Sequence, residues 1–127
     1  MRLLPRPLHG IFDYLVGLLF IMSPWLFGYK NSQPVAADMA MIFGGAMVIY
    51  TALTNFEAGI VRLIPFPAHL ILDVVVGVAL TASPIIFGIR GIAAVVFVAV
   101  GLFELAAASM TRGEGRPSGR PGFPTWS

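Results

Sequence analysis

Four apolar stretches, each about 20 residues long and almost free of charge, decide the solvent in which this chain can fold. They lie near residues 8–28, 35–55, 67–88 and 91–111. A helix of about 20 residues crosses a hydrocarbon core of roughly 30 Å. Because lipid offers the backbone no hydrogen-bond partner, each stretch is predicted to be a membrane-spanning helix.

The composition also favours lipid as the solvent. Hydrophobic residues make up 57% of the chain and charged residues 11%, whereas soluble domains carry about 25% charged residues. The chain has no cysteine, which excludes disulfides, thiolate metal sites and thiol catalysis. Arginines lie at the ends of the apolar stretches and form no nucleic-acid patch. Asp13 interrupts the first stretch, so we expect a retained span and not a signal peptide.

The chain repeats itself. Residues 4–29, "LPRPLHGIFDYLVGLLFIMSPWLFGY", align without a gap with residues 64–89, "IPFPAHLILDVVVGVALTASPIIFGI", and 11 of the 26 positions are identical. Shared hydrophobicity does not explain the matching polar residues, glycines and prolines. Gly45 then aligns with Gly101, which predicts a connection about four residues shorter in the second copy.

This repeat predicts an all-α fold, a four-helix transmembrane bundle made of two tandem helical hairpins. Repeat 1 covers about 4–57 and repeat 2 about 64–111, within one transmembrane domain of residues 1–111. Because each repeat has two spans, both copies insert the same way up, related by a pseudo-twofold axis along the membrane normal. The tail, 112–127, is rich in Gly, Pro and Ser and is predicted to be disordered and cytoplasmic.

Positive charge predicts the orientation of the bundle. Lys30 and Arg90 belong to one side of the membrane, and six arginines belong to the other: Arg2, Arg6, Arg62, Arg112, Arg116 and Arg120. Cytoplasmic segments carry the excess of Lys and Arg. We therefore expect both termini in the cytoplasm.

The motif words "SPWLFG" (23–28) and "HGIFDYLVG" (9–17) resemble those of the SPW repeat family of bacterial integral membrane proteins. The resemblance covers most of residues 4–111, although Ile85 stands in the second copy where Trp25 stands in the first. It implies a multi-pass protein of the bacterial inner membrane. It implies no particular biochemical activity.

Each repeat carries a motif that ends its first helix: Ser23, Pro24 and Trp25 in repeat 1, and Ser83 and Pro84 in repeat 2. Proline frees the carbonyl four residues earlier, and the serine hydroxyl can bond back to the preceding turn. We expect a bend or an unwound last turn, closed by Gly28 or Gly88. Trp25 and Tyr29 suit the aromatic belt at the interface. A hinge or ligand notch is the alternative.

A polar stripe precedes each motif: His9, Asp13 and Gly17, and again His69, Asp73 and Gly77. Residues four apart share a helix face, and charged groups in spans usually face the bundle interior. Glycine permits close helix approach. We therefore predict that the first and third helices pack through these faces near the pseudo-axis.

Three kinds of chemistry suit the paired stripes. Hydrogen bonding between helices is the simplest, proton or ion handling is the second, and ligation of a metal or haem by two histidines is the third. The spacing is common, and the pairs lie in the first turns of their helices. The sequence therefore leads us to assign no metal and no cofactor.

The remaining candidates lie on the second and fourth helices. Glu104 is a buried acid whose position in the first copy holds Val48, and it is expected to meet His69, a partner subunit or water. Small residues in the second and fourth helices, Gly44, Gly45 and Gly101, predict close packing inside the bundle or at an interface with another subunit.

No nucleophile, base and orienting group can be assembled, so no catalytic residue is predicted and we expect no enzyme. The first hypothesis is a small scaffold or accessory subunit that packs as a homo-oligomer or in a larger membrane complex. The second is a small transporter, channel or proton pathway that uses the His/Asp stripes. A water-lined path towards Glu104 would favour the second hypothesis, and helices sealed by direct contacts would favour the first.

Overall fold

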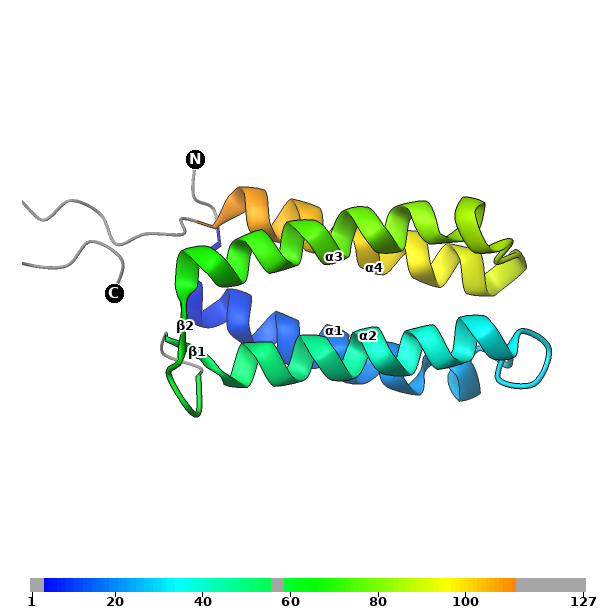
Figure 1. Ribbon diagram of the computed structural model, residues 1–127, viewed down its shortest axis with the longest axis horizontal. Coiled ribbons are helices and arrows are strands. Elements are labelled where there is room, and N and C mark those ends of the chain that lie inside the picture. Colours follow the sequence, from blue (N-terminus) through cyan, green and yellow to red (C-terminus); the bar gives the residue numbers. More distant parts are fainter. Residues whose placement is uncertain (1–3, 56–58, 112–127) are drawn as a thin grey trace, which may run out of the picture.

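The computed structural model describes residues 4–55 and 59–111 and folds as four helices in two hairpins (Figure 1). The helices are α1 (Arg6–Leu26), α2 (Pro34–Ala52), α3 (Phe66–Phe87) and α4 (Gly91–Met110). Each is long and apolar enough to cross a membrane. The predicted all-α bundle is confirmed, with helix boundaries within three residues of those expected. The predicted disordered tail, 112–127, lies outside the described residues.

Both hairpins point the same way. The α1–α2 and α3–α4 turns lie together at one end of the bundle, and the link between the hairpins lies at the other (Figure 1). The link contains a short parallel pair that the sequence did not predict, β1 (Thr54–Asn55) with β2 (Ile64–Pro65). This arrangement confirms two hairpins related by a twofold-like rotation along the bundle axis.

Glycines bring the two helices of each hairpin into close contact. A Cβ on Gly44 would lie 2.7 Å from the carbonyl oxygen of Gly17, and a Cβ on Gly101 would lie 2.8 Å from that of Gly77. The stripe glycines therefore pack α1 against α2 and α3 against α4. The prediction that they pack the first helix against the third is wrong, because α1 packs mainly against α2 and α4, which leaves α3 on the diagonal of the bundle.

Gly45 does not take part in this packing, because a Cβ there would meet nothing within 4 Å. The equivalent of Gly101 is Gly44, so α2 and α4 correspond at an offset of 57 residues. The connection itself spans 27–33 in the first hairpin and 88–90 in the second, so it is four residues shorter in the second copy, as predicted. With this offset, the counterpart of Glu104 is the buried Met47 and not Val48.

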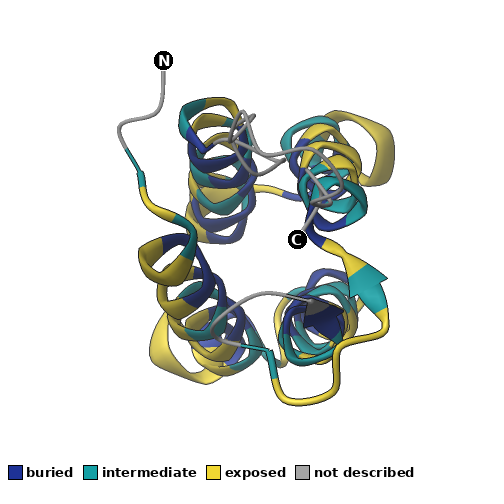
Figure 2. Ribbon diagram, turned by 90° about the vertical axis from the view of Figure 1, so that its left-hand side faces the viewer, coloured by how far each residue is buried: buried dark blue, intermediate teal, exposed yellow. Residues whose placement is uncertain are grey.

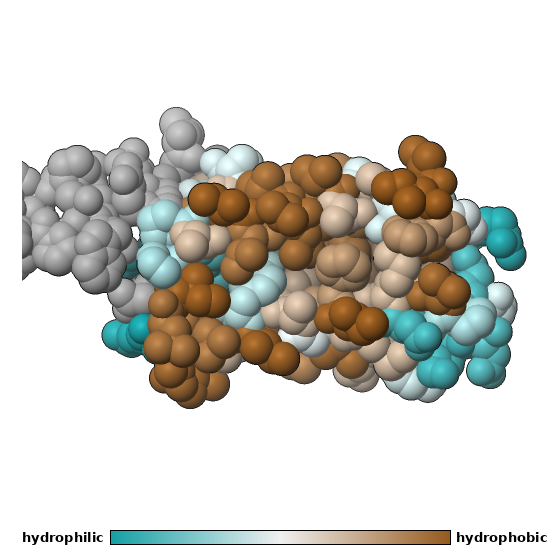
Figure 3. Space-filling view, in the orientation of Figure 1, coloured by the Kyte–Doolittle hydropathy of each residue, from teal (hydrophilic) through white to brown (hydrophobic). Residues whose placement is uncertain are grey.

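Contacts between the hairpins run from α1 to α4 and from α2 to α3. Phe20 of α1 meets Phe97 of α4 edge to face, with ring centroids 5.0 Å apart. Buried residues face the bundle axis (Figure 2). Large apolar side chains are exposed on the outer surface of the helices, as expected where lipid is the neighbour (Figure 3).

The Ser-Pro motifs end α1 and α3 as helix-capping devices. The Ser23 hydroxyl donates to the Phe20 carbonyl at 2.7 Å, and the Ser83 hydroxyl donates to the Ala79 carbonyl at 2.6 Å. Both helices continue through proline and end two to three residues later. Gly28 then adopts φ 75° and Gly88 adopts φ 68°, which is the left-handed conformation that favours glycine at a helix end.

Tyr29 differs from its predicted place in an interfacial belt. Its side chain is buried, and its hydroxyl donates to Ser23, whose own proton goes to the Phe20 carbonyl. Burial raises the pKa of the Tyr29 phenol above its usual value, so the hydroxyl stays protonated as a donor. Trp25 is exposed, with the Lys30 ammonium 5.9 Å from its ring, and its place in an interfacial belt stays a prediction.

Adjacent glycines of α2 provide a matched test of the close packing. Gly44→Ala places a methyl group against the Gly17 backbone, whereas Gly45→Ala places one in open space. We expect Gly44→Ala to lower the stability of the bundle by about 1–3 kcal/mol. We expect Gly45→Ala to be neutral or slightly stabilising, because alanine favours helix more than glycine does.

Thermal melting of the detergent-solubilised protein measures both variants. Equal melting temperatures for the two variants would contradict the assigned packing.

Candidate functional site

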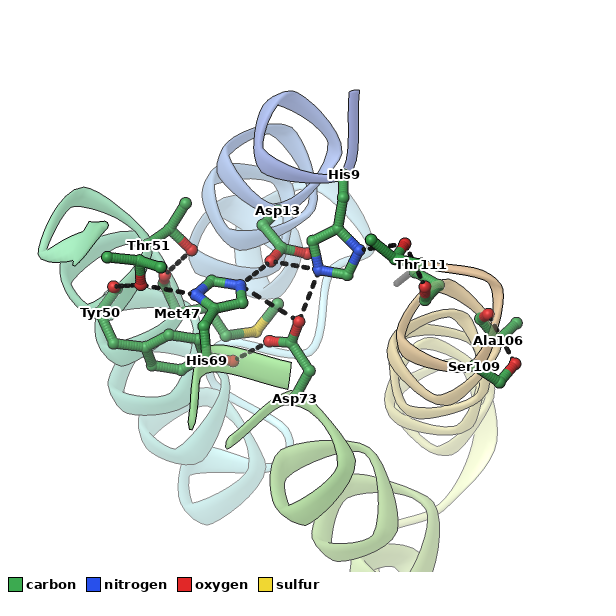
Figure 4. A network of polar contacts seen from close by, with 12 residues as sticks. His9, Asp13, Met47, Tyr50, Thr51, His69, Asp73, Ala106, Ser109 and Thr111 are labelled. Atoms are coloured by element: carbon green, nitrogen blue, oxygen red, sulfur yellow. Dashed lines mark hydrogen bonds and ion pairs between the residues drawn. The ribbon is translucent and has the colours of Figure 1, made fainter. Parts of the chain in front are cut away.

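Two histidines and two aspartates meet on the bundle axis (Figure 4). The His9 Nε2 lies 2.6 Å from Asp73 Oδ2, and the His69 Nε2 lies 2.6 Å from Asp13 Oδ2. Each short contact joins one hairpin to the other. Weaker contacts of 3.1 Å (His9–Asp13) and 3.2 Å (His69–Asp73) run along each helix. We call these four residues the His/Asp ring.

The His/Asp ring lies where the sequence stripes predicted a shared polar face, but the pairing is reciprocal. The i,i+4 spacing favours His9 with Asp13 and His69 with Asp73. The shortest contacts instead exchange partners between the repeats. Because α1 and α3 stand diagonally, their side chains meet across the axis although their backbones do not pack together.

A threonine fixes the outer nitrogen of each histidine. His9 Nδ1 lies 3.0 Å from Thr111 Oγ1, and His69 Nδ1 lies 2.8 Å from Thr54 Oγ1. Thr111 donates its only hydroxyl proton to the Ala107 carbonyl, and Thr54 donates its proton to the Tyr50 carbonyl. Each hydroxyl oxygen must therefore accept from the imidazole, which assigns a proton to both Nδ1 atoms.

The two aspartates of the His/Asp ring differ in the hydrogen bonds that they make to residues outside it. The Tyr50 hydroxyl donates to Asp73 Oδ1 at 2.6 Å. The corresponding oxygen of Asp13, Oδ1, has no hydrogen-bond partner among the described residues. At an offset of 57 the counterpart of Tyr50 is Ala107, which has no hydroxyl to donate. Asp73 is thus bound by the histidines and by Tyr50, whereas among the described residues Asp13 is bound by the histidines alone.

Aromatic side chains enclose the His/Asp ring at the end of the bundle that carries the link. Phe66 is fully buried, stacks on His69 with ring centroids 5.6 Å apart, and meets His9 edge to face at 5.8 Å. The Arg6 guanidinium lies 5.5 Å from the same Phe66 ring. All four members of the ring are at most 1% exposed. The centre is therefore closed to water in this conformation.

Glu104 adds a third carboxyl group beside the His/Asp ring. It is 0% exposed, and its strongest electrostatic neighbours are Asp13 and Asp73. Neither of its carboxyl oxygens meets a hydrogen-bond donor among the described residues, although Asp13 and Asp73 lie close enough to share a proton with the Glu104 carboxyl group. The prediction that it meets His69, a partner subunit or water did not name these carboxyl neighbours. Buried polar groups normally find a partner. The oxygens of this cluster are therefore free to accept hydrogen bonds or to bind a cation.

Among the described residues, Asp38 is the acid that lies outside this centre. Asp38 is exposed near the start of α2. Asp13 stands eight residues into α1, about 10 Å along the helix at 1.5 Å per residue. The His/Asp ring therefore lies between the end of the bundle that carries the link and the middle of the spans.

Sequence reasoning found all four ring residues but missed the residues that orient them. Tyr50, Thr54 and Thr111 lie in segments without an obvious repeat. The predicted alignment of Gly45 with Gly101 gives an offset of 56 residues in this region. The correct offset of 57 pairs Thr54 with Thr111. A search for the same polar residue type in both copies would have found this pair.

Comparison with known proteins places the chain at the level of a family. A family model described as SPW repeat domain matches residues 7–111, which confirms the resemblance read from the motifs. No curated protein and no solved structure matches the chain.

The reciprocal pairs should be coupled energetically. Asp73→Asn leaves His9 without its charged partner in a buried site, which costs about 3–5 kcal/mol of stability. His9→Gln should cost a similar amount. In the double variant the two losses should not add, with a coupling energy of at least about 1.5 kcal/mol.

The measurement is a double-mutant cycle from unfolding in mixed micelles. Asp38→Asn removes an exposed carboxylate and serves as the control with little effect. Additive losses for His9→Gln and Asp73→Asn would contradict the pairing between hairpins.

Proposed function

The chain belongs to the SPW repeat domain family, and from that premise and the closed polar centre we propose that it is a non-enzymatic membrane scaffold. In this proposal it is a multi-pass protein that serves as an accessory subunit, packed against itself or against a larger membrane complex. Its polar centre joins the two hairpins into one rigid body. Its apolar outer surface is available to lipid and to neighbouring helices.

The closure of the His/Asp ring is the observation that carries this proposal. His9, Asp13, His69 and Asp73 are at most 1% exposed, and each is in contact with the opposite hairpin. Reactive groups that bind one another and do not open to the surface are poorly placed to meet a substrate. The same contacts are well placed to fix helix positions, which is what a scaffold requires.

The outer surface supports assembly within the membrane. A groove of about 300 Å³ between α1 and α4 is lined almost wholly by apolar side chains, among them Val16, Leu19 and Phe103. It suits acyl chains or apolar side chains and offers ions almost no polar lining. The small residues of the hairpins, Gly44 and Gly101, are used inside the bundle, so a partner would meet larger aliphatic side chains.

The location forms part of the proposal. The family resemblance and the distribution of arginine favour the bacterial inner membrane with both termini in the cytoplasm. Reporter fusions to the C-terminus and to the 29–34 turn test this orientation. A cytoplasmic reporter should be active at the C-terminus and inactive in the turn, and the reverse result would contradict the orientation.

A transport pathway through the polar centre is the second candidate. Glu104 favours it, because both of its buried carboxyl oxygens lack a hydrogen-bond donor among the described residues. The buried Phe66, which covers both histidines, and the apolar lining of the groove between α1 and α4 argue against it. We therefore place transport second to the scaffold.

Site-specific photo-crosslinking in native membranes tests the scaffold role. A photoreactive amino acid at Ile42, Ile71 or Val95, which are 68%, 63% and 61% exposed, should give discrete adducts larger than the 13.6 kDa chain. The same amino acid at the buried Met47 is the control and should give none. Absence of any protein adduct at all three outward positions would contradict the scaffold.

Proton flux separates the two candidates. In proteoliposomes the wild type and an Asp13→Asn/Asp73→Asn variant should both show only the leak of empty vesicles, because the centre is closed. A wild-type flux above that leak, abolished in the variant, would replace the scaffold with the transport pathway.

A further inference from the structure

We propose that the His/Asp ring binds one divalent transition-metal ion, which ties the two hairpins together. His9, Asp13, His69 and Asp73 would supply the ligands, two nitrogens and two oxygens. The prediction from the sequence assigned no metal, because the His/Asp spacing is common and the pairs lie in the first turns of their helices. The inference goes beyond the scaffold and does not depend on it.

Convergence of the four donor atoms is the first argument. One ligand atom from each ring residue lies within 4.8 Å of all the others. Nitrogen and oxygen alternate around the ring, with four contacts between 2.6 and 3.2 Å. Ligands held about 2.0–2.1 Å from a metal lie about 2.9 Å apart in a planar set and about 3.3 Å apart in a tetrahedral set. The adjacent contacts bracket the planar spacing, and the atoms on opposite corners, up to 4.8 Å apart, would have to move closer together around a metal.

The imidazole tautomer is the second argument. Because Thr54 and Thr111 give their protons to backbone carbonyls, they require Nδ1–H on both histidines. A metal ion that displaces the Nε2 protons of the two ionic contacts leaves each ring neutral, with its Nε2 lone pair directed at the centre. Histidines that bind metals show this arrangement, in which the other nitrogen donates to an outer partner that fixes the ring. Tyr50 orients the Asp73 carboxylate in the same manner.

Protons alone serve this geometry less completely. If each Nε2 carried a proton, that proton would bond one oxygen, at 2.6 Å. The contacts of each histidine with the aspartate on its own helix, at 3.1 and 3.2 Å, would have no proton between the atoms. A central cation contacts all four ligand atoms, two Nε2 and two Oδ2, at once.

Unused oxygens around the ring are the third argument. Asp13 Oδ1 and both oxygens of Glu104 are buried without a hydrogen-bond donor among the described residues. The electrostatic neighbours of Glu104 are the two ring aspartates. Three carboxyl groups packed together in a dry interior need an offset, which either protons or a positive charge can give. A divalent ion provides it, and Glu104 can approach as a further ligand or an outer-layer acceptor.

The donor set indicates the class of ion. Imidazole nitrogen suits Zn²⁺, Cu²⁺, Ni²⁺ and Fe²⁺, whereas Mg²⁺ and Ca²⁺ prefer all-oxygen sites. Two imidazoles and two carboxylates therefore favour a first-row transition metal. Zn²⁺ is the first ion to test, and Co²⁺ is its spectroscopic probe.

Metal analysis of the whole protein tests this proposal. The chain, without an affinity tag, is produced in cells grown with added Zn²⁺ or Co²⁺, purified in detergent, and analysed for metal per mole of protein. We expect about one equivalent of Zn²⁺ that withstands excess Mg²⁺ and Ca²⁺. The Co²⁺ form should show the visible absorption of a site with nitrogen and oxygen protein ligands, distinct from that of hydrated Co²⁺.

Three variants make the result specific to the His/Asp ring. His9→Gln/His69→Gln should lower the metal content at least tenfold. Thr54→Val keeps all four ligands and should weaken Zn²⁺ binding about 10–100-fold in competition with a chelator. Asp38→Asn removes one exposed carboxylate and should leave the metal content unchanged.

A wild-type metal content no higher than that of the double histidine variant would overturn the proposal, as would a Co²⁺ spectrum of the hydrated ion. This readout is independent of any partner protein or ion flux, so it can fail while the scaffold stands. Circular dichroism of each variant confirms that the helices are retained. If the double variant loses its helices, Thr54→Val and the wild-type Co²⁺ spectrum decide the outcome.

Discussion

The reciprocal His–Asp contacts across the bundle axis are the interaction on which the rest of the structure depends. Each hairpin is held internally by close glycine packing, but contacts between the hairpins are sparser. In lipid the hydrophobic effect does not drive helices together, so packing and polar contacts must do so. Two short ionic contacts, His9–Asp73 and His69–Asp13, supply that attraction where the hairpins meet.

The surroundings of the His/Asp ring explain how such polar groups are tolerated inside an apolar protein. A buried charge is costly unless it is paired and hydrogen-bonded. Opposite charges face one another across the axis, threonine hydroxyls bind the outer nitrogens, and Tyr50 binds one carboxylate. Glu104 is the exception, because its carboxyl oxygens meet no hydrogen-bond donor among the described residues. The first repeat carries the buried Met47 at this position. This asymmetry is where the two copies differ most in chemistry.

Much of the fold could be predicted from the sequence because lipid leaves few choices. The length and apolarity of the four stretches predicted the helices, and the copy of residues 4–29 at 64–89 predicted the parallel hairpins. Helix periodicity also placed His9 and Asp13 on one inward face. The partners of these residues could not be predicted, because the i,i+4 rule describes one helix and the reciprocal pairing depends on how two hairpins meet. Tyr29 was misplaced for a similar reason, since its aromatic character suits an interface while its hydroxyl completes the Ser23 cap.

Solid-state NMR in lipid bilayers measures the central contact most directly. The chain has two histidines, so ¹⁵N-histidine and ¹³C-aspartate labels give few and separable dipolar couplings. The reciprocal ring predicts four short-range couplings, because each Nε2 lies within 3.2 Å of a carboxylate oxygen on its own helix and on the opposite hairpin. Couplings only between His9 and Asp13 and between His69 and Asp73 would show that the hairpins do not meet through this ring, and would contradict the account.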